Sequence, residues 1–420
     1  MEQMIRIQGG HLLSGNVEIS GSKNLCVALL PATLLCRGKF VLKNIPPISD
    51  VFYLVEILKK FHAKVVYHGT TLQVDTREIV DQDLLFEEMH QLRASYYFYG
   101  VLLGKKKKLK AKKIGGCKLG SRPIDLHLDV FAQMGVQCEE KEEIYEFDVE
   151  KARPTTYTFP KLSVGATINA VLLAIQIPGT SQFKNIALEP EVTEFLRFLH
   201  KMGADIEGIR TDTITIHGGK SLHGVHFENI PDRIEVGTFA LLGAAIGNPI
   251  VIHPVRFSHI QSLLHVLDNL RIPYERKEDT LTVSHHHFHH GLIIETAPYP
   301  GFPTDLQQPL TALLSSERVL SIVRENVYPE RFAHVPELNK LGATIERDGR
   351  TLYIYGTSEL KGAELSGKDL RGSASLVLGG LMAKGETLVH GVRYLNRGYE
   401  SMIEKLQKIH ANIEIVEVEQ

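Results

Sequence analysis

A single thiol lies in a stretch rich in glycine and positive charge, Gly115-Gly116-Cys117-Lys118-Leu119-Gly120-Ser121-Arg122-Pro123. The neighbouring cations favour the thiolate form of Cys117, and the glycines let the backbone approach a ligand closely. The stretch therefore fits a movable loop that carries a reactive cysteine, able to act as an acid or as a nucleophile. Taken alone, it also fits a small buried cysteine, because a free cysteine is usually a packing residue.

Length and composition indicate two or three globular domains. The chain has 420 residues, of which 43% are apolar, and a formal net charge of -2, so no general attraction to nucleic acid or to an anionic membrane is expected. Its four cysteines form no C-x-x-C pair, which argues against a zinc site or a disulfide framework and fits a reducing cytoplasm. No leader pattern and no apolar run of about 18 residues occurs, so we expect a cytoplasmic protein without a membrane span.

The order of predicted elements indicates one unit written six times. The first copy has a helix at 25–35, a strand at 39–44, a helix from Val51 to near His62 and a hairpin at 64–74; a short opening strand precedes it at 16–20. The second helix recurs at 128–134, 192–202, 260–270, 337–341 and 402–409. Several copies end in glycine, where a helix C-cap needs a left-handed residue. Alternating helices and strands predict helices packed on sheets, in two domains of three units.

The first helix of the unit also recurs, at intervals of about 70 residues, and each copy opens on polar residues. The openings are near Lys23, Arg93, Ser163-Val164-Gly165, Val236-Gly237-Thr238, Thr304-Asp305 and Asp369-Leu370-Arg371. Helix N-termini offer free N–H groups and positive potential, which suit phosphate and carboxylate. Ser, Thr and Asp at these places also fit ordinary helix caps. Capping does not account for Lys23, Arg93 and Arg371.

Taken together and in order, these stretches resemble the UDP-N-acetylglucosamine enolpyruvyl transferases, or UDP-N-acetylglucosamine 1-carboxyvinyltransferases, over essentially the whole chain. The motifs that carry the resemblance are Gly21-Ser22-Lys23-Asn24, Leu92-Arg93-Ala94-Ser95, the Cys117 loop, Ser163-Val-Gly-Ala-Thr167, Pro231-Asp-Arg-Ile-Glu235, Pro303-Thr304-Asp305, Asp369-Leu370-Arg371 and Arg397-Gly398-Tyr399-Glu400.

The resemblance implies the enolpyruvyl transferase fold of the α/β (α+β) class. This fold is a two-domain inverse α/β barrel built from six repeated β-α-β-α-β-β units, with helices inside and sheets outside. The implied domains are 22–231, which carries the Cys117 loop, and 1–21 with 232–420. The implied active site is the cleft between them, closed by that loop.

The resemblance also implies an activity. The enolpyruvyl group of phosphoenolpyruvate is transferred to the 3-hydroxyl of UDP-N-acetylglucosamine by addition and elimination, phosphate is released, and no metal or other cofactor takes part. This is the first committed step of peptidoglycan precursor synthesis. Such chemistry needs an acid at C3 of phosphoenolpyruvate, a base near the sugar hydroxyl, and cations for phosphate and carboxylate. The partners are small molecules, without nucleic acid or membrane, and the oligomeric state is left open.

Individual roles follow from the same resemblance. Cys117 is the proton donor to C3 and can bond covalently to phosphoenolpyruvate; Asp305 is the base or proton shuttle at the sugar hydroxyl, the alternative being an ordinary cap; Lys23 and Arg397 complete the catalytic group. The implied substrate-binding residues are Asn24, Arg93, Arg122, Ser163, Val164, Gly165, Val327, Arg331, Asp369 and Arg371. Arginine suits these anions because its planar fork binds phosphate and carboxylate bidentately.

Two positions depart from the family pattern. Asn396 stands where an aspartate usually precedes Arg-Gly-Tyr-Glu, and Ser49 stands where a lysine usually precedes Asp50. Asn396 removes a charge that could orient Arg397, and Ser49 removes a cation on the phosphate side. Both changes bear on substrate affinity more than on the type of reaction.

Two further clusters are interpreted without a function. The lysines at 105–108, 110, 112 and 113 alternate in a way that suits a strand with one wet face, and lysines discourage edge pairing. The run His285-His-His-Phe-His-His290 could bind zinc or nickel adventitiously, but the number of ligands alone does not make a closed site.

Two rival functions remain at this point. A 3-phosphoshikimate enolpyruvyl transferase shares the fold, but the Cys117 loop and Pro303-Thr304-Asp305 favour the nucleotide-sugar enzyme. A non-catalytic anion-binding scaffold would be expected to have lost Cys117, Asp305 or Lys23, and all three are present.

Overall fold

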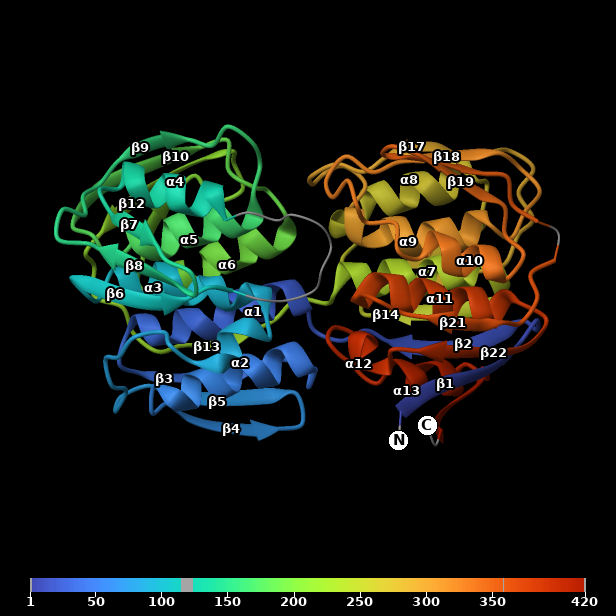
Figure 1. Ribbon diagram of the computed structural model, residues 1–420, viewed down its shortest axis with the longest axis horizontal. Helices are drawn as coiled ribbons and strands as arrows, with labels where there is room; N and C mark the ends of the chain where they lie inside the picture. Colours follow the sequence, from blue (N-terminus) through green and yellow to red (C-terminus); the bar gives the residue numbers. More distant parts are fainter. Residues whose placement is uncertain (1, 115–123, 358, 419–420) are drawn as a thin grey trace. The chain divides into compact units, whose positions relative to one another are not determined.

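A computed structural model describes residues 2–114, 124–357 and 359–418, and the chain folds into two compact units. The N-terminal unit comprises the described residues of 21–230, and the C-terminal unit comprises those of 231–420 together with the first twenty residues. In Figure 1 the N-terminal unit is coloured from blue to green. The C-terminal unit runs from yellow to red and includes two blue strands from the start of the chain.

The described strands of the N-terminal unit form three sheets, ordered β13-β3-β5-β4, β11-β12-β10-β9 and β6-β8-β7. The strands are β3 (Lys39–Lys43), β4 (Lys64–His68), β5 (Thr71–Asp75), β6 (Lys108–Lys112), β7 (Gln137–Glu140), β8 (Ile144–Asp148), β9 (Thr156–Thr158), β10 (Gly179–Lys184), β11 (Asp205–Glu207), β12 (Thr213–Gly218) and β13 (His226–Glu228). In both four-stranded sheets one edge strand, β13 or β9, runs parallel to its neighbour and the other neighbours are antiparallel. In the third sheet a parallel bridge from Leu84 to Ala111 takes that place.

The C-terminal unit repeats this pairing pattern in sheets ordered β15-β16-β14-β2, β17-β18-β20-β19 and β21-β22-β1-β23. Its strands are β1 (Glu2–Gly9), β2 (Leu13–Glu18), β14 (Gly247–His253), β15 (Tyr274–Lys277), β16 (Thr280–Val283), β17 (Ile293–Glu295), β18 (Ser321–Arg324), β19 (Ile345–Asp348), β20 (Thr351–Ile354), β21 (Glu364–Ser366), β22 (Gly385–His390) and β23 (Asn412–Val418). The parallel edge strands are β2, β17 and β21. The same pairing pattern therefore recurs in both units, with the isolated bridge as its shortest form.

The described residues of each unit form three central helices and three outer helices. The central helices are α1 (Lys23–Ala32), α3 (Tyr97–Leu103), α5 (Val164–Ala174), α7 (Arg233–Ile246), α9 (Thr304–Leu314) and α11 (Leu370–Met382). The outer helices are α2 (Ser49–Lys60), α4 (Asp125–Gln133), α6 (Pro190–Lys201), α8 (Gln261–Asn269), α10 (Val335–Lys340) and α13 (Met402–Lys408). Shorter helical segments are η1 (Thr33–Leu35), η2 (Glu87–His90), η3 (Arg93–Tyr96), η4 (Phe257–His259) and α12 (Val392–Leu395).

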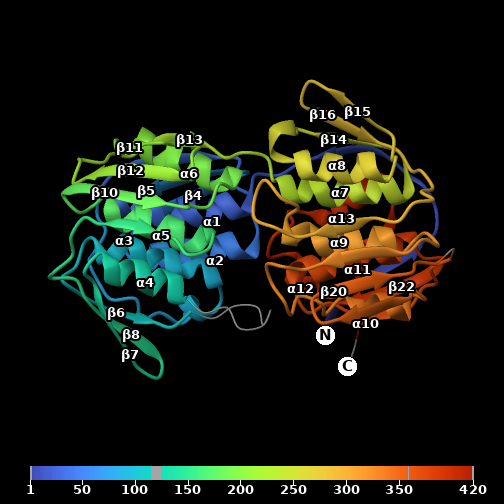
Figure 2. The same ribbon diagram turned by 90° about the horizontal axis from the view of Figure 1, so that it is seen from above.

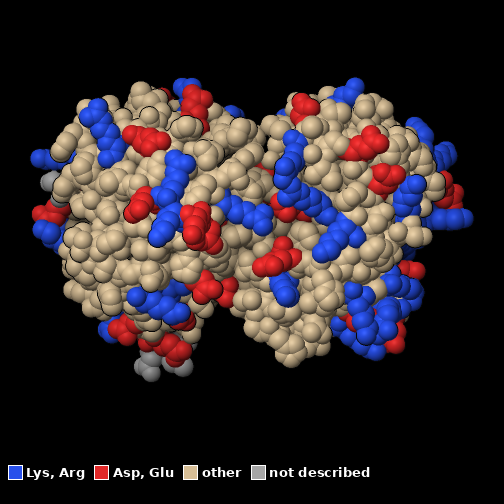
Figure 3. Space-filling view, turned by 180° about the vertical axis from the view of Figure 1, so that it is seen from behind, with Lys and Arg blue, Asp and Glu red and all other residues tan. Residues whose placement is uncertain are grey.

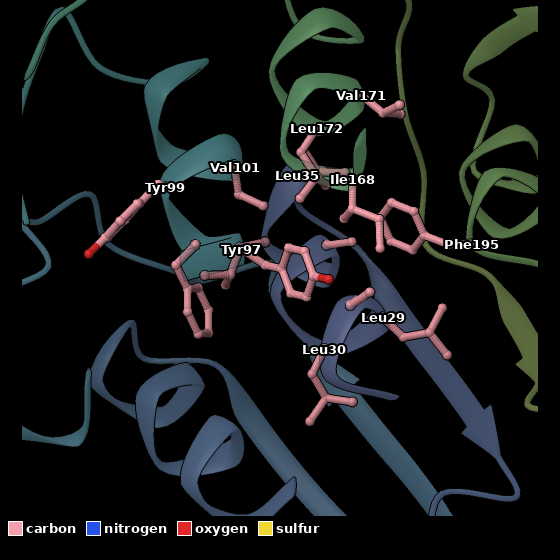
Figure 4. Packing of buried hydrophobic residues seen from close by; sticks show 14 of the residues in the cluster. Leu29, Leu30, Leu35, Tyr97, Tyr99, Val101, Ile168, Val171, Leu172 and Phe195 are labelled. Atoms are coloured by element: carbon pink, nitrogen blue, oxygen red, sulfur yellow. The ribbon is translucent and has the colours of Figure 1, made fainter. Parts of the chain in front are cut away.

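The central helices are buried along most of their length because they lie in the middle of each unit. Ten of the eleven residues of α5 are buried, and α5 packs against α3 as α9 packs against α7 and α11. Figure 4 shows this core in the N-terminal unit, with Leu29 of α1, Tyr97 of α3 and Ile168 of α5 among its buried side chains. Figure 2 shows α7, α9 and α11 side by side inside the C-terminal unit. Buried helices and outer sheets confirm the expected arrangement.

A left-handed residue follows every outer helix. The predicted glycine caps are confirmed, since Gly135, Gly203 and Gly342 have φ of 86°, 105° and 93°. The other three outer helices end with non-glycine residues in the same conformation, namely His62, Arg271 and His410. The cap geometry is therefore a property of the repeated unit, which holds even where the residue type makes it less favourable.

Several predicted boundaries are wrong. The fourth central helix begins at Arg233 rather than near Val236, because Asp232 caps it with hydrogen bonds from the N–H groups of the next turn. The second begins as the short η3 at Arg93 and becomes α3 only at Tyr97. The α/β class and the six units are confirmed, and the six sheets of the described residues are open rather than closed into a barrel.

The opening strand expected at 16–20 is also wrong in its bounds, since two strands, β1 and β2, cover the start of the chain. β1 lies between β22 and β23, with Ile5 opposite both Val389 and Ile415. In Figure 1 the blue β1 accordingly lies beside the red strands of the chain's end. The first and last described strands thus lie in one sheet of the C-terminal unit.

Candidate functional site

The strongest charge cluster of the C-terminal unit surrounds Asp305, the second residue of α9. Its Oδ1 accepts a hydrogen bond of 2.7 Å from Arg331 Nη1, and its Oδ2 accepts one of 3.3 Å from Arg371 Nη2. The side chain of Asp305 is 23% exposed, whereas both arginines are buried. The residue at the N-cap position of α9 is Pro303, whose side chain makes no capping bond. Both carboxylate oxygens of Asp305 accept hydrogen bonds from arginines, so the carboxylate is held by two cations.

Both arginines retain buried donors that the described residues do not use. Arg331 Nε and Arg371 Nη1 have no hydrogen-bond acceptor in the described part of the chain. Burial opposes the charge of each guanidinium, but nearby groups outweigh it and raise the pKa of both: chiefly Asp305 and Asp369 for Arg331, and Tyr399 and Asp305 for Arg371. Buried polar groups normally have partners, so two charged donors without one suit an anionic ligand.

A buried glutamate fixes the segment that carries Val327 and Arg331. Glu325 Oε1 accepts hydrogen bonds of 2.8 Å from the backbone N–H of Val327 and of Tyr328. Its Oε2 accepts a bond of 2.9 Å from Thr304 Oγ1, which in turn accepts one of 3.1 Å from Arg331 Nη1. Thr304, the first residue of α9, is thereby joined to Arg331, which also binds Asp305, the second residue.

Asp369 and Arg397 lie on neighbouring elements. Asp369 caps α11: its Oδ1 accepts from the backbone N–H of Arg371 at 3.1 Å and of Gly372 at 3.0 Å. Helix capping therefore explains these backbone contacts of Oδ1 of Asp369. The other oxygen, Oδ2, accepts a hydrogen bond of 3.3 Å from Gln308 Nε2. Arg397 follows α12 and is half-buried, and the neighbouring Asn396 is exposed.

In the N-terminal unit Lys23 is the first residue of α1, and the side chain of Ser22 caps that helix. Lys23 Nζ lies 2.9 Å from Oδ2 of Asp50, in the first turn of α2; the lysine side chain is 15% exposed and the aspartate 0%. Asn24, the next residue of α1, is half-buried. Asp50 was not predicted as a site residue, because nothing local in the sequence pairs it with a lysine 27 positions earlier.

Asp50→Asn is expected to lower the free energy of unfolding by about 3 kcal/mol, because removing one partner of a buried ion pair leaves the other charge uncompensated. Urea denaturation of the purified protein measures this. The matched control is Glu56→Gln on the same helix, which breaks the exposed pair with Lys59 and should change stability by less than about 0.5 kcal/mol. Equal effects of the two variants would contradict a buried anchor for Lys23.

A second cluster of this unit brings Arg93 close to the start of α5. The Arg93 guanidinium lies 5.9 Å from the centre of the Tyr96 ring, and that ring lies 4.5 Å from the ring of His127. A Cβ added to Gly165 would lie 2.7 Å from Tyr96 Oη and 2.8 Å from His127 Cε1, so only glycine fits there. Ser163 caps α5 by accepting a bond of 3.2 Å from the N–H of Ala166, and Val164 opens the helix.

His127 is a member of this cluster that sequence reasoning missed. It is buried, and its Nδ1 lies 2.8 Å from Asn169 Nδ2. Burial, and to a lesser extent the charge of Arg93, lower the pKa of His127 to about 3, so the ring is neutral at physiological pH. The sequence feature that could have identified His127 is its place as a polar residue on the apolar face of α4, in line with Val130, Phe131 and Met134.

Some predicted residues lie outside the described part of the chain: Cys117, Arg122 and the rest of 115–123. The lysine strand is confirmed, since β6 alternates exposed and buried residues and Lys106, Lys110 and Lys113 pair with Asp83, Glu146 and Glu140. On the face shown in Figure 3, Lys and Arg side chains are interspersed with Asp and Glu.

The histidine run forms no closed set of ligands. Its His287 Nδ1 lies 2.6 Å from Glu317 Oε1. Among the residues that the structure describes, no group of three or more His, Cys, Asp or Glu side chains is placed to hold a metal ion. Over the same residues, no helix combines the length and the apolar character needed to cross a membrane.

Comparisons with known proteins give a consistent result. The sequence matches the EPSP synthase (3-phosphoshikimate 1-carboxyvinyltransferase) family over residues 7–406. It is 42% identical to UDP-N-acetylglucosamine 1-carboxyvinyltransferase 2 of Streptococcus pyogenes serotype M18, over 98% of this chain and 99% of the relative. It is 40% identical to the protein of the same name from Listeria monocytogenes, over 98% of each chain.

Solved structures agree with this likeness. The enolpyruvyl transferase NikO from Streptomyces tendae superposes with a TM-score of 0.90 at 26% identity, covering 99% of each chain. EPSP synthase from Acinetobacter baumannii gives a TM-score of 0.72 at 15% identity, covering 99% of this chain and all of the other. The fold is the enolpyruvyl transferase fold.

Proposed function

The chain belongs to the EPSP synthase family of enolpyruvyl transferases, and from this premise we propose that it transfers the enolpyruvyl group of phosphoenolpyruvate to the 3-hydroxyl of UDP-N-acetylglucosamine and releases phosphate. The observation that carries the proposal is the carboxylate of Asp305, held at the start of α9 by two buried arginines that keep spare donors. It combines a proton acceptor with binding groups for an anion. The choice of acceptor rests on the full-length likeness to relatives named for that nucleotide sugar.

The reaction has two steps. In the addition, Asp305 takes the proton of the 3-hydroxyl while the hydroxyl oxygen forms a bond to C2 of phosphoenolpyruvate. The thiol of Cys117 gives a proton to C3. In the elimination, the Cys117 thiolate takes a proton from C3, the bond between C2 and the phosphate oxygen breaks, and the double bond forms again. Inorganic phosphate leaves with the proton that Asp305 had taken, so both side chains return to their starting state.

The cations stabilise the charges of both steps. Arg331 and Arg371 are suited to this because a guanidinium binds carboxylate or phosphate through two parallel hydrogen bonds, and a buried site strengthens each of them. We assign Lys23, Arg122 and Arg397 to the same anions. The ion pair with Asp50 supports Lys23 in this role, since it fixes the ammonium at the start of α1.

The nucleotide sugar is assigned to the remaining predicted residues, which are Asn24, Arg93, Ser163, Val164, Gly165, Val327 and Asp369. The contact of Arg93 with Tyr96, beside the glycine that opens α5, supports a shared role for this cluster. We propose residues 22–231 and residues 1–21 with 232–420 as the two domains that supply these groups. A cytoplasmic location fits cysteines without a paired spacing.

The purified protein is expected to release phosphate from phosphoenolpyruvate only when UDP-N-acetylglucosamine is also present, because the addition needs the sugar hydroxyl. Phosphate release is followed with each substrate alone, with both, and with both after treatment with a chelator, which should leave the rate unchanged. Shikimate 3-phosphate serves as the competing acceptor. Turnover with that acceptor would overturn the choice of substrate, and binding of both substrates without turnover would favour a non-catalytic scaffold.

A further inference from the structure

The segment after Arg397 is fastened to the first turns of α7 by two buried contacts. Lys405 Nζ lies 2.7 Å from Glu235 Oε1, and Tyr399 Oη lies 2.8 Å from Thr238 Oγ1. Glu235 and Thr238 are one helical turn apart, so they lie on one face of α7. The loop that carries Arg397 is therefore held against a rigid element.

Tyr399 is the more informative of these contacts, because it faces the cluster around Asp305. The side chain is fully buried, and its ring centre lies 5.0 Å from the guanidinium carbon of Arg371. Thr238 Oγ1 already donates its single proton to the carbonyl of Ile234 at 2.9 Å. The hydroxyl of Tyr399 is therefore the donor to Thr238, and its oxygen and ring remain available to the cation.

These contacts join the beginnings of three central helices. Thr238 of α7 accepts from Tyr399, Tyr399 lies against Arg371 of α11, and Arg371 donates to Asp305 of α9. The described groups beside Arg371 thus include the ring of Tyr399 and the carboxylate of Asp305. A cation attracted by both an aromatic face and an anion has less freedom to turn, because turning away from either group loses one attraction.

We propose that Tyr399 is a positioning residue of the enolpyruvyl transfer reaction: anchored by Thr238, it fixes the guanidinium of Arg371 beside Asp305 and holds the loop that carries Arg397. The inference rests on the proposed function. Tyr399 and Thr238 do not touch the reacting atoms. They fix the direction in which Arg371 and Arg397 face phosphoenolpyruvate. Loss of their contact should therefore weaken the binding of that substrate selectively.

Tyr399→Phe keeps the ring and removes only the hydroxyl. It is expected to lower kcat/KM for phosphoenolpyruvate about tenfold, the ratio that corresponds to one lost buried hydrogen bond, while KM for UDP-N-acetylglucosamine changes less than about twofold. Thr238→Val removes the same bond from the other side and should have a similar effect. The double variant should be no worse than either single one, because all three lack the same interaction.

Tyr99→Phe is the matched control. Tyr99 is a fully buried tyrosine of the N-terminal unit whose hydroxyl donates to the carbonyl of Lys112 at 2.7 Å. It should lower thermal stability as much as Tyr399→Phe does and leave both KM values unchanged. Equal kinetics for the two variants, or additive losses in the double variant, would overturn the inference.

Calorimetry separates this inference from the proposed function. The affinity of the wild type, Tyr399→Phe and Tyr99→Phe for phosphoenolpyruvate is measured without turnover. A wild type that binds phosphoenolpyruvate but does not transfer it to the nucleotide sugar would contradict the proposed function alone. The ratio of the affinities then decides the role of Tyr399. Tyr399→Phe is expected to bind phosphoenolpyruvate about tenfold more weakly than the wild type, and Tyr99→Phe is expected to bind it with unchanged affinity. A wild type that does not bind phosphoenolpyruvate would overturn both.

Discussion

Asp305→Asn is expected to lower kcat by about 10³-fold, in the range that a positioned general base contributes, while the folded protein still binds UDP-N-acetylglucosamine. The amide cannot take a proton from the sugar hydroxyl. It also presents an NH₂ group to one of two arginines that each need an acceptor, so Arg331 or Arg371 loses its partner. Paired rate measurement and calorimetry separate the loss of turnover from any loss of binding.

The comparison with alanine adds a structural test. Asp305→Ala leaves two buried guanidinium groups facing each other without the carboxylate, so it should abolish turnover and also lower the melting temperature. Asp279→Asn, at an exposed aspartate of the same unit, is the control that should leave both unchanged. Turnover of Asp305→Asn within tenfold of the wild type would remove this carboxylate from the mechanism.

Fosfomycin, an epoxide phosphonate, is expected to inactivate the protein over time by alkylating Cys117. Its phosphonate resembles the phosphate of phosphoenolpyruvate, so the cations proposed for that substrate should hold it while a thiolate opens the strained ring. Mass spectrometry should find one added inhibitor mass, on the peptide that contains Cys117, and UDP-N-acetylglucosamine should speed the reaction.

The described cysteines make this test selective. Cys26 is buried, and burial raises the pKa of the half-buried Cys36 to about 11, whereas Cys138 is exposed. At pH 7 only about one in 10⁴ of the Cys36 thiols is ionised, and the thiolate is the nucleophile. A label on any of these three residues, or no label on an active enzyme, would contradict the assignment of Cys117.

Cys117→Asp is the informative variant. A carboxylic acid of similar reach should keep part of the turnover, because it can still give a proton to C3. It should resist fosfomycin, because a carboxylate is a poor nucleophile toward an epoxide. Full sensitivity of this variant would show that inactivation does not pass through the side chain at position 117.

The parts of the fold that could be predicted are those encoded locally. The glycine after Met134, Met202 and Leu341 predicts a left-handed residue at the end of an outer helix. The spacing of these glycines predicts the repeated unit. The place of β1 could not be predicted in this way, because its partners β22 and β23 lie about 400 residues further along the chain. Pairing between strands so far apart in the sequence produces no periodic pattern from which it could be predicted.

The same division holds for the candidate site. Asp369 and Asp305 both stand at the start of a central helix, yet one is a cap and the other lies between two arginines. Residue type and position do not separate these roles, because the difference arises from Arg331 on another segment. Asp50 and His127 were missed for the same reason: each becomes a site residue through a tertiary neighbour.

The position of β1 has a consequence for synthesis of the protein. The N-terminal unit is made of described residues between 21 and 230, so it can fold while the ribosome is still translating the sequence that follows. β1 is made before the other described strands, but its two neighbours, β22 and β23, come late in the described sequence. Until β22 and β23 have been made, both edges of β1 are open to pairing with other chains, so this strand is made early but can join its sheet only late.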